Sequence, residues 1–156
     1  MSKRLPVNGL VELLVPEAIR VNLLATSKEG VLGELCGLLF SADLVRDQAA
    51  VLQAVLAREQ AGSTGCGSGV AVPHARISGI DRTVLALGLS KSGIEFGALD
   101  SLPVNIFFLM VGPQKAPEIY LKLLSQIAQL IKEDEFRGAL LSCESTAEVI
   151  ELFRTV

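Results

Sequence analysis

Two short apolar segments constrain the fold of this chain more than any other feature of its sequence. Residues 84–89 and 104–111 are almost continuously apolar, rich in β-forming side chains and bounded by turn residues. Such segments are typical of strands that are buried on both faces, and a sheet of such strands requires helices on both sides. The 156 residues suit one domain. We therefore predict a single α/β domain over residues 1–156, a sandwich with a central mixed β-sheet flanked by helices on both faces.

Helical spacing of apolar residues predicts two helices before these strands, after a short N-terminal lead. The first is expected over residues 27–44, and residues 26–29 (Thr-Ser-Lys-Glu) have the form of a capping box at its start. Asp47 is the predicted N-cap of the second helix, and Gly62 is predicted to follow its last turn. These helices supply one covering layer of the sandwich.

The second half of the chain predicts the other layer. Residues 90–93 and 97–103 have the composition of turns between the two strands. An amphipathic helix is expected after Pro117. A last helix is expected to open with a capping box at residues 145–148 and to reach Phe153.

Charge and composition exclude two classes of function. Fourteen basic side chains against 17 acidic ones give a net charge of −3, and aromatic residues make up only 4% of the chain. Nucleic-acid binding needs clustered Lys and Arg, and base stacking needs aromatic rings. The longest apolar run, residues 106–111, is far shorter than the roughly 20 residues that span a bilayer, and the N-terminus lacks the apolar core of a signal peptide. We expect a soluble cytoplasmic protein that binds no nucleic acid and does not insert into a membrane.

The cysteines point to reduced thiols and not to a metal or catalytic site. Cys36, Cys66 and Cys143 are an odd number at wide spacings, unlike a disulfide framework. Together with His74 they match the ligand count of a Cys₃His zinc site, but structural zinc sites bring their ligands in close pairs. A catalytic pair of Cys66 and His74 would need a group that orients the base, and none is evident. We expect no metal and no cofactor.

Residues 61–69 (Ala-Gly-Ser-Thr-Gly-Cys-Gly-Ser-Gly) are too rich in glycine for a helix or a regular strand, so we expect a loop. They match neither nucleotide-binding motif. Gly62 and Gly67 have P-loop spacing, but Ser-Gly replaces the Lys-Ser/Thr pair, and Val70 stands where a dinucleotide fingerprint has its third glycine. One interpretation is a plain connection from a helix to a strand. The other is a loop whose N–H groups, with the hydroxyls of Ser63 and Thr64, bind an anion.

The only histidine of the chain, His74, follows this loop. Pro73 holds it on a stiff extended segment, and a neutral imidazole keeps one lone pair that can act as a nucleophile, although a lone histidine can also be structural. Arg58 falls on the apolar side of the second helix, in its last turn. Its guanidinium either offsets the helix dipole with its head in water, or points into a pocket shared with His74 and binds phosphate there.

The segment over residues 57–76 resembles a known active-site signature. Its Ser-Thr-Gly at 63–65 followed by Val-Pro-His at 72–74 is similar to the mannitol/fructose-type enzyme IIA domain of the bacterial phosphoenolpyruvate-dependent sugar phosphotransferase system, a family that includes the nitrogen-regulatory IIA proteins. Residues 21–29, 96–104 and 109–113 extend the likeness over most of the chain. The family fold, a mixed sheet between helices, agrees with the pattern described above.

The resemblance implies roles for individual residues. His74 matches the histidine that accepts a phosphoryl group on its tele ring nitrogen from the histidine-containing phosphocarrier protein, and Arg58 matches the arginine that pairs with that group. Thr64 lies in the same signature as a phosphoryl-stabilising candidate. Tyr120 stands where many members have a second histidine. It either donates a hydrogen bond to a phosphoryl oxygen, without becoming cationic, or packs at the rim as an ordinary helix-start residue. No metal is required for transfer between two histidines.

Three functional hypotheses follow. The first is a stand-alone regulatory IIA protein of the nitrogen type, whose phosphorylation state reports the supply of phosphoenolpyruvate to regulatory partners; Tyr120 suits signalling better than sugar flux. The second is a transport IIA protein that donates its phosphoryl group to a IIB domain of a fructose- or mannitol-class permease. The third is an interaction module whose His74 is never phosphorylated. For the first two, we expect His74 in a shallow concavity on which Arg58 and Tyr120 converge.

Overall fold

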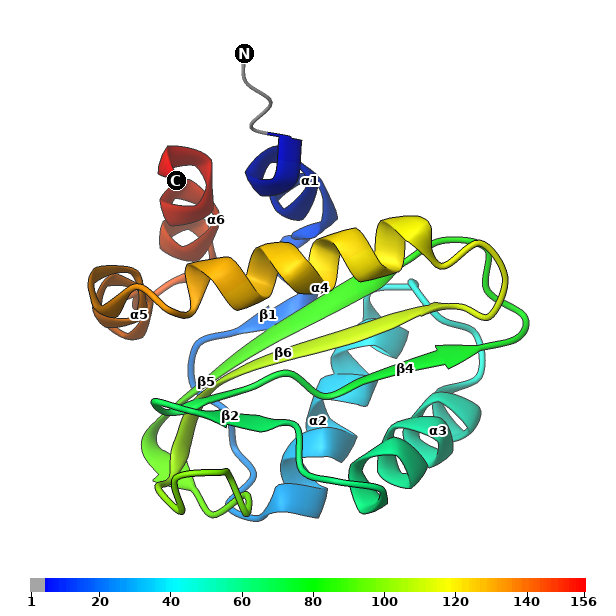
Figure 1. Ribbon diagram of the computed structural model, residues 1–156, viewed down its shortest axis with the longest axis horizontal. Helices are drawn as coiled ribbons and strands as arrows, with labels where there is room; N and C mark the ends of the chain where they lie inside the picture. The colour runs from blue at the N-terminus through cyan, green and yellow to red at the C-terminus, as the bar shows by residue number, and fades with distance from the viewer. Residues whose placement is uncertain (1–4) are drawn as a thin grey trace.

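A mixed β-sheet forms the centre of the protein (Figure 1). The computed structural model describes residues 5–156, with side chains from Gly9 onward. At the middle of the sheet, β5 (Val84–Ile94) and β6 (Val104–Pro113) pair antiparallel. β1 (Ile19–Arg20) adds parallel to the other edge of β5. The predicted central strands are therefore confirmed, and the sheet is mixed as expected.

Three short strands complete the other side of the sheet. β3 (Val70–Ala71) and β4 (His74–Ile77) both run parallel to β6, one after the other along the same edge. β2 (Gly65–Gly67) pairs antiparallel with β3 through an irregular register. The glycine-rich segment was predicted to be a loop, and this prediction is wrong for its centre. Hydrogen bonding to β3 stabilises an extended backbone that the sequence disfavours.

Helices cover both faces of the sheet (Figure 1). On one face lie α2 (Lys28–Ser41) and α3 (Gln48–Gln60), which pack on β5 and β4 respectively. On the other face, α4 (Glu118–Leu130) crosses β6, and the remaining helices gather beside it: α1 (Leu5–Leu13), α5 (Asp134–Leu141) and α6 (Thr146–Thr155). A short 3₁₀ helix, Pro16–Ala18, leads into β1. No helix within residues 5–156 is long and apolar enough to cross a membrane.

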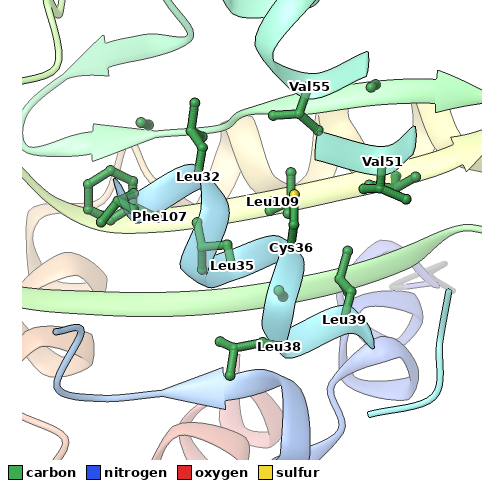
Figure 2. Close-up of a cluster of buried hydrophobic side chains, with 14 of the residues drawn as sticks. Leu32, Leu35, Cys36, Leu38, Leu39, Val51, Val55, Phe107 and Leu109 are labelled. Carbon is green, nitrogen blue, oxygen red and sulfur yellow. The ribbon is translucent and has the colours of Figure 1, made fainter. Parts of the chain in front are cut away.

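Side chains of β5 and β6 point alternately into two separate cores. Both faces of each strand are therefore buried, and this is why the two sequences are almost continuously apolar. Phe107 and Leu109 pack under α2 and α3 (Figure 2), where α2 contributes Leu32 and Leu35. Phe108 and Met110 enter the opposite core below α1, α4, α5 and α6. The alternation follows from the pleat of a strand, whose successive side chains leave on opposite faces.

Side-chain caps fix the starts of three helices. Asp47 accepts a hydrogen bond from the backbone N–H of Ala50 at 3.0 Å, and Ser145 accepts one from Glu148 at 3.1 Å, as predicted. The first capping box was predicted one residue too early. Ser27, not Thr26, is the N-cap of α2, and its hydroxyl accepts from the N–H of Gly30 at 3.0 Å.

Other local predictions need correction. The turn expected at residues 90–93 lies inside β5, which continues to Ile94 with a shift in register after Leu89. The first helix ends at Ser41 and not at Leu44, because Asp43 takes up a left-handed conformation with φ of 62°. The expected lead contains α1 and β1, and α5 was not predicted; residues 1–4 of that lead lie outside the described part of the chain.

Candidate functional site

His74 is the first residue of β4, and the sheet fixes its position. It lies opposite Met110 of β6 in a parallel register, and the carbonyl of Pro73 accepts a hydrogen bond from the N–H of Met110 at 3.0 Å. Pro73 itself limits the backbone before the histidine. The imidazole is half-buried, so one part of the ring is supported by protein and another part remains accessible.

One hydrogen bond determines which ring nitrogen of His74 is free. Nδ1 lies 2.7 Å from the carbonyl oxygen of Val72. A carbonyl oxygen can only accept, so Nδ1 must carry the proton of this bond. In the neutral ring the lone pair is then on Nε2, which can act as a nucleophile. This geometry fits the expected tele position.

A hollow of about 470 Å³ opens beside His74. Its wall contains His74, Arg58, Arg76 and Tyr120, together with Ala54, Ala75 and Gln114. The predicted concavity is therefore present, and Arg58 and Tyr120 converge on it from α3 and α4. Arg76 was not identified from the sequence. It follows His74 by two residues on an extended segment, and this spacing was the signal that could have revealed it.

Arg58 binds a backbone carbonyl near the end of its helix and also lines the hollow, and its binding of a phosphoryl group stays a prediction. It lies in the last turn of α3, and its Nη1 donates to the carbonyl of Gly62 at 2.8 Å, which satisfies a backbone group just beyond the helix end. The guanidinium also lines the hollow at His74. A guanidinium carries five N–H donors, so this one bond leaves others available for an anion.

Tyr120 is more buried than a rim residue, with 3% of its surface exposed. Its ring stands edge-on to the imidazole of His74, with the ring centroids 6.3 Å apart at an angle of 61°. The ring also packs against Gly112 of β6, where any Cβ atom would overlap the ring. Burial raises the pKa of Tyr120 to about 12, although Arg76 and Arg58 oppose this shift. The hydroxyl is thus a neutral donor throughout the physiological pH range.

Thr64 belongs to a buried polar network that shapes the loop before His74. The carboxylate of Glu59 accepts the Thr64 hydroxyl at 2.6 Å and the Thr64 N–H at 2.9 Å, and it pairs with Lys28 at 3.0 Å. The Thr64 carbonyl in turn accepts from the N–H of Val72 at 3.0 Å. Since Val72 orients the imidazole, the network supports the site indirectly. A direct bond from Thr64 to a phosphoryl group stays a prediction, and it requires the hydroxyl to leave Glu59.

A second, more apolar hollow of about 360 Å³ also borders the histidine. Arg58, Thr64 and His74 reach it, and apolar side chains form much of the remaining wall: Val72, Leu99, Leu124, Ala128 and Ile131. Cys66 also lines it as an exposed thiol, whose pKa is raised by partial burial. His74 therefore lines both a hollow that holds two arginines and a more apolar one.

Comparison with known proteins establishes the family. Residues 12–156 match the family model described as phosphoenolpyruvate-dependent sugar phosphotransferase system, EIIA 2. The chain belongs to this family. As an EIIA protein of type 2, it has the mannitol/fructose-type fold expected from its sequence, with a mixed sheet between helices.

Its relatives include both regulatory and transport proteins. The chain is 35% identical over 141 residues to a nitrogen regulatory protein of Pseudomonas aeruginosa, covering 90% of this chain and 91% of that protein. It is 33% identical over 143 residues to a PTS system fructose-specific EIIABC component of Bacillus subtilis, covering 92% of this chain but only 22% of that longer protein. Nitrogen regulatory proteins are the most numerous names among these relatives.

Solved structures agree with the family assignment. The crystal structure of the nitrogen regulatory protein IIA-Ntr from Neisseria meningitidis superposes with a TM-score of 0.85 at 30% identity, covering 92% of this chain and 98% of that one. A complex of enzyme IIA mannitol with phosphorylated enzyme IIB mannitol from Escherichia coli matches with a TM-score of 0.76 at 19% identity, over 92% of this chain and 98% of that one. The second likeness concerns the fold alone.

Proposed function

We propose that this EIIA protein accepts a phosphoryl group on Nε2 of His74 from the histidine-containing phosphocarrier protein, and that its phosphorylation state serves regulation of the nitrogen type. The hydrogen bond from Nδ1 of His74 to the carbonyl of Val72 carries this proposal. It orients the ring and leaves the Nε2 lone pair free. As Nε2 attacks, the ring gains positive charge, and the Val72 carbonyl stabilises the proton that remains on Nδ1.

The transfer breaks one P–N bond and forms another. The Nε2 lone pair of His74 attacks phosphorus in line, while the leaving electron pair returns to the carrier's imidazole. Beyond the attack of Nε2, the protein needs to form no covalent bond in such a step. Catalysis therefore depends on how the two imidazoles are positioned and on positive charge around the equatorial oxygens. Arg58 and Tyr120 line the same hollow as His74, and in this proposal Arg58 supplies the positive charge and Tyr120 a neutral donor. The role of Thr64 is to hold the loop, with direct donation as the further prediction stated above.

Regulation is the first choice because nitrogen regulatory proteins are the most numerous names among the relatives. Two fructose-specific relatives, one of them of similar length to this chain, support a second candidate, sugar transport, in which His74 passes its phosphoryl group to a IIB domain. IIA and IIB interact in the Escherichia coli mannitol complex. A IIB domain or a regulatory protein is therefore the proposed downstream partner. Both roles place the protein in the cytoplasm, where its proposed phosphoryl donor works.

Reconstitution with phosphoenolpyruvate, enzyme I and the phosphocarrier protein tests the acceptor. We expect an acid-labile, base-stable phosphate that is lost in His74→Ala. Because His74 is the only histidine, any phosphohistidine in the purified chain must lie there. Labelling that survives this substitution would contradict the proposal. A wild-type chain that folds but takes no label would favour the interaction-module hypothesis.

A second stage separates regulation from transport. Purified phospho-protein is mixed with a IIB domain of a fructose-class and of a mannitol-class permease. A regulatory protein should keep its label over minutes, whereas a transport protein should lose it to one of the two domains within seconds. Rapid and complete transfer to either domain would replace the regulatory proposal with the transport one. A further set of pull-downs, with wild type and His74→Ala, would then identify partners that depend on phosphorylation.

A further inference from the structure

Arg76 is placed by strand geometry on the same side of the sheet as His74. Both lie on β4, two residues apart, and such residues point to the same face about 7 Å from each other along the strand. Arg76 lines the same hollow of about 470 Å³ as His74.

The neighbouring strand keeps Arg76 close to Tyr120. Arg76 pairs in register with Gly112 of β6, and the Tyr120 ring occupies the space that a side chain at Gly112 would need. Among the residues that the structure describes, the Arg76 guanidinium makes one hydrogen bond, a long one of 3.4 Å to the carbonyl of Gln114. This weak contact leaves most of its N–H donors free.

Two guanidinium groups therefore meet at the same hollow without a counter-ion from the chain. Within residues 5–156, the ion pairs of the protein involve neither Arg58 nor Arg76. Like charges repel, so gathering them near His74 costs free energy unless an anion binds between them. Arginine holds phosphate through paired N–H donors, and a phosphoryl group on Nε2 would be such an anion.

We propose that Arg76 is a second phosphoryl-binding residue, which contacts the phosphoryl oxygens on His74 from β4 while Arg58 contacts them from α3. The inference rests on the proposed phosphorylation of His74. Tyr120 completes the arrangement from α4, so three elements each supply one donor to the group.

The test compares Arg76→Ala and Arg76→Lys with Arg46→Ala, a control arginine that is exposed at a different hollow. The initial rate of phosphoryl transfer from the carrier and the half-life of phospho-His74 are measured, with folding checked by urea unfolding. Loss of one charge-assisted hydrogen bond predicts about a tenfold lower rate or shorter half-life for Arg76→Ala. Arg76→Lys keeps the charge but lacks the paired donors, so its transfer rate and half-life should lie between those of Arg76→Ala and the wild type. Arg46→Ala should match the wild type.

A direct readout distinguishes contact from a structural role. In ¹⁵N-labelled protein, the guanidinium N–H signals of Arg76 should shift on phosphorylation, and they should still shift in Arg58→Ala. Two results would show that Arg76 is no phosphoryl ligand although His74 remains the acceptor. One is that Arg76→Ala is phosphorylated and dephosphorylated at wild-type rates, and the other is that the guanidinium signals of Arg76 in the wild type do not shift on phosphorylation. If the wild-type chain takes no label at all, the proposed function fails, and this inference with it.

Discussion

Replacing Gly112 by alanine should damage both the fold and the site, because a single backbone position supports Tyr120. A methyl group there would overlap Cδ1 of Tyr120 and lie 3.1 Å from its Cε1 and 3.2 Å from Oγ1 of Thr83. Gly112 cannot easily retreat, since β6 is hydrogen-bonded to β4 on one side and to β5 on the other. The nearly buried ring must move instead. Overpacking of this kind typically costs about 1–3 kcal/mol.

Urea unfolding measures this cost, with Gly138→Ala as the matched control. Gly138 lies in α5, and a Cβ there would meet nothing within 4 Å. Alanine is the better helix former, so the control should gain up to about 1 kcal/mol. Gly112→Ala should instead lose about 2 kcal/mol and should be phosphorylated more slowly, because the hydroxyl of Tyr120 moves with its ring.

A double-mutant cycle identifies the clash as the cause. In a Tyr120→Ala background the added methyl has room, so Gly112→Ala should cost little there, and the coupling should reach about 1 kcal/mol or more. Additive losses would show that the strain lies elsewhere in the strand. A loss of unfolding free energy below about 0.5 kcal/mol for Gly112→Ala alone would refute the argument. Such a small loss is typical of surface substitutions, and it is incompatible with a ring packed on this glycine.

Three further predictions concern other parts of the molecule. Burial by itself raises the pKa of Glu34, but N–H groups of the chain and Arg20 bind its carboxylate and lower the pKa on balance. The ionised Glu34 carboxylate therefore stabilises the fold fully above about pH 4.3, and this stabilisation is lost as pH falls through the lower folded pKa. In Glu34→Gln, the free energy of unfolding should depend less on pH in this acidic range, and an unchanged dependence would contradict the argument. A thiol reagent should modify Cys66 alone in the native protein and all three cysteines in denaturant, because the other two are buried; rapid loss of more than one native thiol would disagree. Ser145→Ala removes the cap of α6 and should cost about 1 kcal/mol in urea unfolding, and no measurable cost would mean that water replaces the cap.

Local sequence patterns predicted those elements whose signals lie within one segment. The apolar runs at 84–89 and 104–111 became β5 and β6, and the N-caps Asp47 and Ser145 were found because a capping residue acts on its own helix. The capping box at 26–29 was misplaced because Thr26 and Ser27 are chemically equivalent candidates. Only the backbone path shows which one stands at the helix start.

Elements with weak local signals were missed. α5 buries only Phe136 and Leu140, and the sequence of α1 contains Pro6 and Gly9, which lower its helical propensity. Packing against neighbouring helices stabilises such short elements. The extension of β5 through residues 90–93 has a similar origin. Pairing with β6 resumes at Ile94 despite turn-forming residues in between.

The sequence by itself determined that the chain is an α/β sandwich and that His74 lies on a stiff segment after a glycine-rich one, because these features depend on residues adjacent along the chain. The resemblance to a known family added the expectation that Arg58 and Tyr120 converge on His74, and the tertiary structure decided how the groups around the imidazole are arranged. Val72 selects the free nitrogen, α3 brings Arg58, and the register of β4 with β6 sets Arg76 beside Tyr120. Such contacts depend on pairing between segments that are distant in the sequence, and the pattern of residues within one segment cannot predict them.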